Sequence, residues 1–209
     1  MKIKFIIALL ITVFITPFAI AADSPDGSGY FVGLNLGYAD RQLAQNSFFQ
    51  NNPSSITTAG FAGRASVGYS FGPHFALGSG FVLLPNAQAS FPTYQVQSSS
   101  YIFDFLFRAS IPFQHNFSVY GKLGMAYVNT NLSVTSQAGS SANEFRPVIA
   151  AGIAYAINQA ISVNLEWYNL IGGTNSLNGY AQTQQVNQGG SYATIPSVNL
   201  YTVGIVYLF

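Results

Sequence analysis

Five charged side chains are the strongest candidates for chemistry in this sequence, because each lies in a segment where small or polar residues alternate with large apolar ones. All five share the small and polar side of that alternation: Arg64, Asp104, Arg108, Lys122 and Glu166. A period of two places successive side chains on opposite faces of a β-strand, so the five are expected on one common face. Charges withdrawn from water persist only when paired and hydrogen-bonded. We therefore predict a buried charge network that joins these groups.

A simple register across the short connection at residues 112–116 predicts which charges meet. It places Leu106 opposite Lys122, so that Asp104 and Arg108 become diagonal neighbours of the lysine. Two uses of such a network stay open. It either fills a narrow interior, or it acts as a gate in which exchange of ion-pair partners opens a solute path.

Enzymatic chemistry is weakly supported. The two histidines, His74 and His115, lie in short predicted turns, away from the Ser-rich long connections that would have to supply a nucleophile. The chain has no Cys, which excludes disulfides, thiolate metal sites and a Cys nucleophile. Asp104 and Glu166 are better explained as ion-pair partners than as an acid–base pair. We predict no enzyme, no cofactor and no metal site.

Eight alternating segments position the five charges. Each is about ten residues long, which suits a tilted membrane strand. The predicted strands are 29–39, 59–71, 75–84, 100–111, 117–128, 146–157, 161–169 and 198–209. An even number of such segments predicts an all-β fold, an eight-stranded antiparallel transmembrane β-barrel with up-and-down topology.

The opposite face of the segments is apolar and carries aromatic rings near both ends. Only 6% of the residues are charged and 15% are aromatic, whereas a soluble domain carries about 25% charged residues. A soluble barrel would point its charged face outward, and here Arg64 shares a face with Gly and Ser. We predict an aromatic girdle at the two membrane interfaces: Tyr30, Tyr38, Tyr69, Tyr101, Tyr127, Tyr155, Trp167, Tyr201 and Tyr207.

Short and long connections alternate along the chain. Three are short, at 72–74, 112–116 and 158–160, and four are long and rich in Asn, Gln, Ser and Gly: 40–58, 85–99, 129–144 and 170–196. This alternation is typical of bacterial outer-membrane barrels, with the short turns periplasmic and the long loops extracellular. We expect both termini in the periplasm.

The N-terminus reads as a secretory signal peptide over residues 1–21. Lys2 and Lys4 precede an apolar run, and Ala19-x-Ala21 offers a cleavage site before Ala22, with cleavage after Ala22 as the alternative. Residues 22–28 form a short periplasmic lead, and 29–209 form the barrel domain. Removal of Lys2 and Lys4 from the 7 basic residues leaves 5 against 6 acidic ones. No basic patch survives, which argues against nucleic acid as a partner.

The last strand carries a family resemblance. Thr202, Gly204, Tyr207 and Phe209 stand at the offsets of the C-terminal signal by which the barrel-assembly machinery recognises outer-membrane barrels. The stretches 117–124, 146–148, 155–157 and 165–168, together with Asp104, resemble the OmpA/OmpX-type outer-membrane β-barrel domain. No peptidoglycan-binding domain follows the barrel, a departure from full-length OmpA-type proteins that places a wall-anchoring role in doubt.

The resemblance and the residues together predict a monomer in contact with outer-membrane lipids. The expected role is structural or surface-interacting: envelope integrity, adhesion or host contact through the four long loops, whose extracellular ligand is unknown. A narrow, low-conductance channel gated by the lumen ion pairs is the alternative. A lipid-modifying enzyme is third, because a His near the long loops is missing.

Overall fold

The computed structural model describes residues 27–42, 55–90, 95–113, 115–134, 140–172 and 197–209. They form ten β-strands and contain no helix long and apolar enough to cross a membrane. The strands are β1 (Ser28–Gln42), β2 (Ser55–Thr57), β3 (Ala59–Phe71), β4 (Phe75–Leu83), β5 (Ala87–Ser90), β6 (Gln95–Pro112), β7 (Phe117–Val134), β8 (Ser140–Ala156), β9 (Ile161–Leu170) and β10 (Ser197–Leu208).

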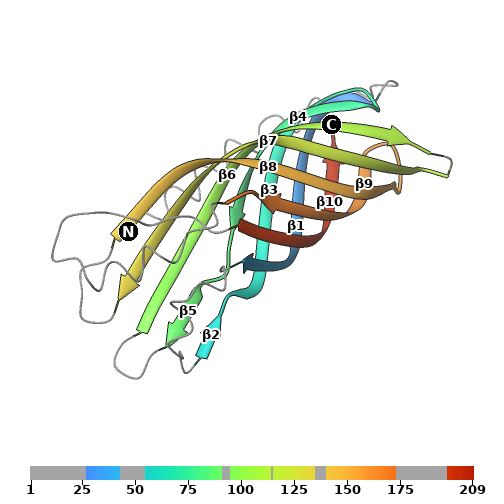
Figure 1. The fold of residues 1–209 in the computed structure, drawn as a ribbon. Helices are drawn as coiled ribbons and strands as arrows, with labels where there is room; N and C mark the ends of the chain where they lie inside the picture. The colour runs from blue at the N-terminus through green and yellow to red at the C-terminus, as the bar shows by residue number, and fades with distance from the viewer. Residues whose placement is uncertain (1–26, 43–54, 91–94, 114, 135–139, 173–196) are drawn as a thin grey trace, which may run out of the picture.

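Eight of these strands close into an antiparallel barrel, as the sequence predicts (Figure 1). The order around the barrel is β1, β3, β4, β6, β7, β8, β9, β10 and back to β1. The closing pair joins the first and last strands and sets Leu34 against Ile205 and Tyr38 against Tyr201. The predicted pairing of 198–209 with 29–39 is thereby confirmed, and closure leaves the barrel without a free edge.

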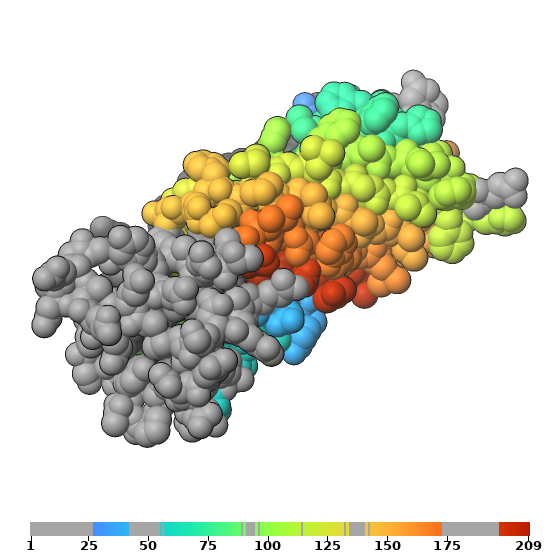
Figure 2. Space-filling view, viewed as in Figure 1, coloured from blue at the N-terminus to red at the C-terminus, as the bar shows by residue number. Residues whose placement is uncertain are grey.

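Burial alternates residue by residue along the barrel strands. On β9, Asn164, Glu166 and Tyr168 are buried, while the intervening Leu165 and Trp167 are exposed. The wall formed by β7, β8 and β9 is continuous on the face shown in Figure 2. The barrel therefore has an apolar outer face and a filled lumen, and its core is the inner face of its own sheet.

The two ends of the barrel differ. The turn end carries the short connections at residues 72–74, 113–116 and 157–160, and the loop end lies opposite. At the turn end, Ile157 N donates to Ile161 O at 2.9 Å, and Asn158 Oδ1 accepts from Ala160 N and Ile161 N at 2.9 and 2.7 Å. These local bonds fix tight reversals between neighbouring strands.

Strand structure reaches well into three segments that the sequence predicted as loops, which is a correction. β2, β5 and the adjoining parts of β6, β7 and β8 form an extension of the wall beyond β1, β9 and β10 (Figure 1). Its sequence is rich in Ser, Gln and Asn, and apolar alternation there is short, as at Leu132 and Val134. The alternation of side chains does not predict these strands. A strand that projects past the apolar belt is held by backbone hydrogen bonds to its neighbours and does not require an apolar face.

The register across the β6–β7 turn also differs from the prediction. Arg108, not Leu106, stands opposite Lys122, because Pro112 remains in β6 and pairs with Ser118. The chain then reverses over 113–117, with Phe113 N donating to Phe117 O at 2.7 Å. His115 and Asn116 adopt positive φ of 64° and 63°, and this left-handed pair shifts the register by two residues.

Several predictions lie outside the described residues. They are the signal peptide 1–21 with its cleavage site, nearly all of the lead 22–28, and most of the predicted loops 40–58 and 170–196. The domain bounds 22–28 and 29–209 stay predictions.

Candidate functional site

Arg64 and Asp104 form a bidentate ion pair in the middle of the lumen. Arg64 Nε donates to Asp104 Oδ2 at 3.0 Å and Nη2 donates to Oδ1 at 2.8 Å. Only 4% and 0% of the two side chains are exposed. Arg64 Cζ also lies 5.9 Å from the ring centroid of Tyr168. Two parallel charge-assisted bonds satisfy both oxygens of the carboxylate, the condition under which a buried pair persists.

Lys122 and Glu166 form a second buried pair. Lys122 Nζ donates to Glu166 Oε2, and the Tyr120 hydroxyl donates to the same oxygen at 2.8 Å. Four of the five predicted groups therefore form two separate ion pairs, and Arg108 belongs to neither. Neither pair follows the diagonal contacts to Lys122 that the predicted register implied.

A glycine lies on the strand between the two partners of each polar contact. Gly80 on β4 lies between Arg64 and Asp104, and a Cβ there would lie 2.6 Å from Arg64 Nη2. Gly152 on β8 lies in register with both Tyr120 and Glu166. In a narrow barrel, inner side chains of alternate strands converge, and the intervening position must be small.

The same arrangement recurs in an amide pair. Asn35 Nδ2 donates to Asn164 Oδ1 at 2.7 Å and to Thr202 Oγ1 at 3.4 Å. Gly204 lies between the two asparagines, in register with each. The sequence predicted inward glycines that leave room in the lumen, but it did not indicate which polar side chains meet across them.

Arg108 is the one member of the predicted network that no carboxylate holds within 4 Å among the described residues. Its Nε donates to Ser110 Oγ at 2.9 Å, and its Cζ lies 4.1 Å from the ring centroid of Tyr120. Lys122 stands directly opposite on β7. The positive charges of Arg108 and Lys122 repel each other in this position. The repulsion favours the orientation in which the Lys122 side chain bonds to Glu166 instead.

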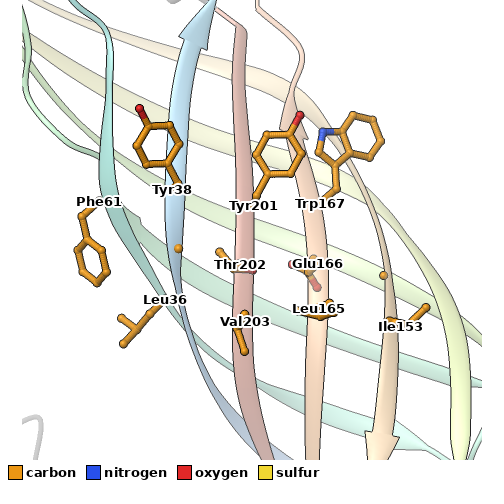
Figure 3. A pocket seen from close by; sticks show the side chains of 12 residues that line it. Leu36, Tyr38, Phe61, Ile153, Leu165, Glu166, Trp167, Tyr201, Thr202 and Val203 are labelled. Atoms are coloured by element: carbon orange, nitrogen blue, oxygen red, sulfur yellow. The ribbon is translucent and has the colours of Figure 1, made fainter.

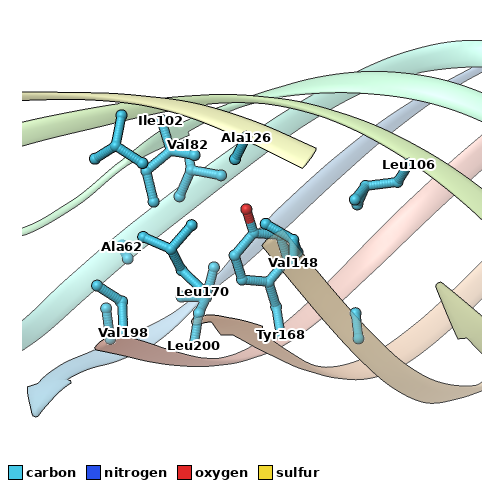
Figure 4. Packing of buried hydrophobic residues seen from close by; sticks show 13 residues of the cluster. Ala62, Val82, Ile102, Leu106, Ala126, Val148, Tyr168, Leu170, Val198 and Leu200 are labelled. Atoms are coloured by element: carbon cyan, nitrogen blue, oxygen red, sulfur yellow. The ribbon is translucent and has the colours of Figure 1, made fainter. Parts of the chain in front are cut away.

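An apolar cluster fills the lumen on the loop side of the charges (Figure 4). On the strands that contribute both, the cluster residues are nearer the loop end, for example Ile102 before Asp104 on β6 and Tyr168 after Glu166 on β9. Leu106 is the exception, because it lies on the turn side of Asp104. The cluster consists mainly of Ala39, Ala62, Val82, Ile102, Ala126, Val128, Val148, Tyr168, Leu170, Val198 and Leu200. Sequence reasoning missed it, although several inward positions near the loop end were already apolar.

The predicted girdle residues lie on the outer face. Tyr38, Tyr201 and Trp167 stand in register on three neighbouring strands, with Phe61 beside Tyr38 (Figure 3). Below them runs an aliphatic row of Leu36, Val203, Leu165 and Ile153. Near the turn end the rings of Tyr30 and Tyr69 lie edge to face at 5.1 Å, and those of Phe117 and Tyr155 lie 4.8 Å apart. The remaining predicted members are Tyr101, Tyr127 and Tyr207, also on this face.

The four residues of the predicted insertion signal lie on or directly after β10. Thr202 and Gly204 face the lumen, while Tyr207 faces outward. Phe209 N donates to Tyr30 O at 2.8 Å, so the last residue is bonded to β1 at the closing seam. The rings of Tyr207 and Phe209 lie edge to face, 4.6 Å apart.

The histidines stand at the turn end, where the sequence placed them. His74 is exposed, with its Nδ1 3.3 Å from Ser110 O, and His115 is exposed in the β6–β7 turn. Among the described residues, no group of three His, Cys, Asp or Glu side chains could hold a metal ion.

A closed barrel that faces outward with aliphatic and aromatic side chains and keeps its ion pairs inside defines an integral membrane β-barrel. The model of a known family, described as the outer membrane protein beta-barrel domain, matches residues 6–209. The chain therefore belongs to this family and is a protein of the bacterial outer membrane. The predicted resemblance to OmpA/OmpX-type barrels is confirmed.

Individual relatives are distant. The chain is 24% identical to an uncharacterized protein of Coxiella burnetii (strain RSA 493 / Nine Mile phase I), over 90% of this chain and 88% of that one. Neisserial surface protein A shares the fold with a TM-score of 0.58 and 12% identity, over 87% of this chain and 99% of that one. For the N-terminal barrel of Pseudomonas aeruginosa OprF the TM-score is 0.54, with 10% identity and coverage of 88% and 98%.

Proposed function

We propose that this protein is a non-conducting outer-membrane barrel that anchors a surface-exposed loop region and contributes to envelope integrity or surface contact. The observation that carries the proposal is the apolar cluster across the lumen at the loop end. Hydrated ions do not cross a layer of packed Val, Leu, Ile and Tyr side chains without a large desolvation cost. The extension formed by β2, β5, β6, β7 and β8 adds a rigid support for the loops.

The apolar cluster also bears on the alternative of a narrow channel gated by ion pairs. Exchange of partners between Arg64–Asp104 and Lys122–Glu166 rearranges the middle of the lumen but leaves the cluster in place. The non-conducting barrel is therefore favoured over the channel. An enzymatic role has less support, because both histidines lie at the end opposite to the loops.

Planar-bilayer recording tests the non-conducting barrel. We expect no discrete openings from the wild type, and openings from a variant that removes two of the largest cluster residues, Tyr168→Ala with Leu200→Ala. Lys122→Ala serves as the comparison that perturbs only an ion pair. Regular openings of one size in the wild type, increased by Lys122→Ala, would establish the gated channel instead.

A complementation experiment distinguishes a role in envelope integrity from a role in surface contact. A strain that lacks the protein is given either the wild type or a chain in which residues 173–196 are replaced by a short turn. If both restore detergent resistance, the barrel itself supports the envelope. If only the wild type restores attachment to a surface, the loop carries an interaction. Failure of the wild type to change either property counts against the proposal.

We further propose that the turn end is periplasmic and the loop end extracellular, the usual orientation for barrels with short turns and long loops. The chain lacks Cys, so single substitutions report position cleanly. A membrane-impermeant maleimide applied to intact cells should label Ser141→Cys on β8 and should label Gln159→Cys at the turn end only after lysis. The reverse pattern would invert the orientation.

The insertion signal and the partners remain proposals of the same kind. The barrel-assembly machinery would bind Thr202, Gly204, Tyr207 and Phe209 before β10 pairs with β1. Phe209→Ala should therefore lower the amount of folded barrel in cells while leaving refolding of purified protein into vesicles nearly unchanged. An equal loss in both settings would indicate a role in barrel stability alone.

Outer-membrane lipids surround the barrel, which we expect to be a monomer.

A further inference from the structure

A small cavity lies inside the lumen, lined by Arg64, Lys122 and Arg108 and extending toward the turn end. It has a volume of about 30 Å³, and its polar lining includes Arg64, Arg108, Lys122, Tyr120, Ser66 and Asn164. A polar cavity needs roughly 10–15 Å³ of this measure to hold one water molecule. The space therefore suits one small ion or one or two water molecules, and nothing larger.

The charges around this cavity do not balance. Three cationic side chains line it, and none of its lining residues is a carboxylate. Asp104 uses both oxygens on Arg64, and Glu166 accepts from Lys122 and Tyr120. Of the five charged groups in this part of the lumen, three are positive and two are negative. One positive charge therefore remains, and it belongs to Arg108.

Hydrogen-bond donors also face the cavity in excess. Arg108 uses Nε on Ser110 Oγ and stacks on Tyr120, and among the described residues no carboxylate bonds to its terminal nitrogens. Asn164 accepts from Asn35 through its oxygen, which leaves its amide N–H groups as donors. Ser66 adds a hydroxyl that can donate or accept, and Asn35, whose Nδ2 donates to Asn164, adds one acceptor oxygen. This wall offers more donors than acceptors.

We propose that this cavity binds a small monovalent inorganic anion, with Arg108 as its principal ligand and chloride as the ion of suitable size and abundance. An arginine at a water-exposed surface is neutralised by counterions from the solvent. Lipid surrounds the barrel wall and keeps such counterions away from Arg108 on that side. A water molecule in the cavity would satisfy donors but leave the excess charge uncompensated. A halide does both, because it accepts hydrogen bonds and carries one negative charge. Arg108 is only partly buried, which gives the ion a route along this side chain.

Bromide provides a direct test, because it replaces chloride and scatters anomalously. Crystals of the full barrel grown or soaked in sodium bromide should show an anomalous peak in the cavity, within hydrogen-bonding reach of Arg108. A cavity without a peak, or bromide peaks confined to the outer surface, would overturn the proposal. This measurement needs only the wild type and stands even if a variant fails to fold.

Chloride-dependent stability gives a second, independent test. At constant ionic strength, replacement of gluconate by chloride should raise the urea midpoint of unfolding until the site saturates, since a ligand of the folded state stabilises it by mass action. Arg108→Gln should abolish this rise, and Arg108→Lys should retain part of it. Arg146→Gln, which changes a cation outside the cavity, is the matched control and should behave like the wild type. An equal rise in all four proteins would show a general salt effect and overturn the assignment.

Discussion

At the scale of single residues, the same kind of ion pair occurs in this protein in two different environments. Arg64 and Asp104 are almost completely buried, whereas the side chains of Arg146 and Glu144 are 19% and 41% exposed. Loss of one partner of a buried pair leaves an uncompensated charge in a medium of low polarity, and loss of a partner in an exposed pair leaves a charge that water solvates. The contribution of each pair therefore depends on its surroundings more than on its geometry.

The corresponding prediction compares two neutralising substitutions. Asp104→Asn should lower the free energy of unfolding by about 3–5 kcal/mol, because Arg64 then stays buried without its charge partner. Glu144→Gln should lower it by less than about 1 kcal/mol. Urea unfolding in lipid vesicles measures both. Similar losses for the two variants would contradict the distinction between buried and exposed pairs.

At the scale of the strands, a glycine on the strand between two partners lets inner side chains on alternate strands meet. Gly152 and Gly204 lie in register with both partners of such a contact, while Gly80 lies in register with Asp104 and beneath the Arg64 guanidinium. The three contacts involve different chemistry: an Arg–Asp pair, a Tyr–Glu hydrogen bond and an Asn–Asn bond. The common cause is geometric. Strong curvature of an eight-stranded wall brings the inner side chains together and leaves little volume over the strand between them.

Gly152 on β8 gives a clear test of this geometry. An added Cβ would meet the backbone oxygen of Leu165 and would lie 2.5 Å from the Tyr120 hydroxyl. Gly152→Ala should therefore lower the free energy of unfolding by about 1–3 kcal/mol, the usual range for overpacking. The matched control is Gly121→Ala on β7, where the nearest atom lies 3.9 Å away and where we expect a change within about 0.5 kcal/mol. Equal effects of the two would show that backbone propensity, rather than crowding, dominates.

At the scale of the whole molecule, we expect the two aromatic bands to fix the depth of the barrel in the membrane. Trp167 is the only Trp of the chain, and it lies in the loop-side row with Tyr38 and Tyr201. Its Nε1 donates to Asn199 Oδ1 at 3.1 Å, so the polar edge of the ring is held toward the loop end. This arrangement suits the interface, where an amphipathic ring has one apolar and one hydrated side.

Brominated lipids test this depth. Trp167 fluorescence should be quenched more strongly by bromine near the carbonyl end of the acyl chain than by bromine near its terminus. A variant that moves the indole one row deeper, Leu165→Trp with Trp167→Phe, should shift the strongest quenching toward the chain terminus, since the two positions differ in depth by about 5 Å once strand tilt is allowed for. The same quenching profile for both proteins would contradict the predicted position.

The sequence predicts those structural features that follow from the alternation of side chains along a strand, and it does not predict the others. Parity alone places Arg64 and Glu166 inside and Tyr201 and Trp167 outside, because a strand has only two faces. It also finds eight barrel strands and the closing pair of β10 with β1. It does not find β2, β5 or the outer parts of β6, β7 and β8, because strands beyond the apolar belt carry no apolar pattern.

By itself, then, the sequence determined the family, the closed barrel, the lumen-facing or outward orientation of side chains on the eight predicted strands, and the candidate residues of the lumen. The tertiary structure alone decided which of those residues meet. A two-residue shift at His115 and Asn116 set Lys122 opposite Arg108, and closure brought Arg64 to Asp104 and Lys122 to Glu166 across intervening strands. The physical reason is that parity follows from local backbone geometry, whereas contacts across a curved wall depend on turn conformation, register and closure of the whole sheet.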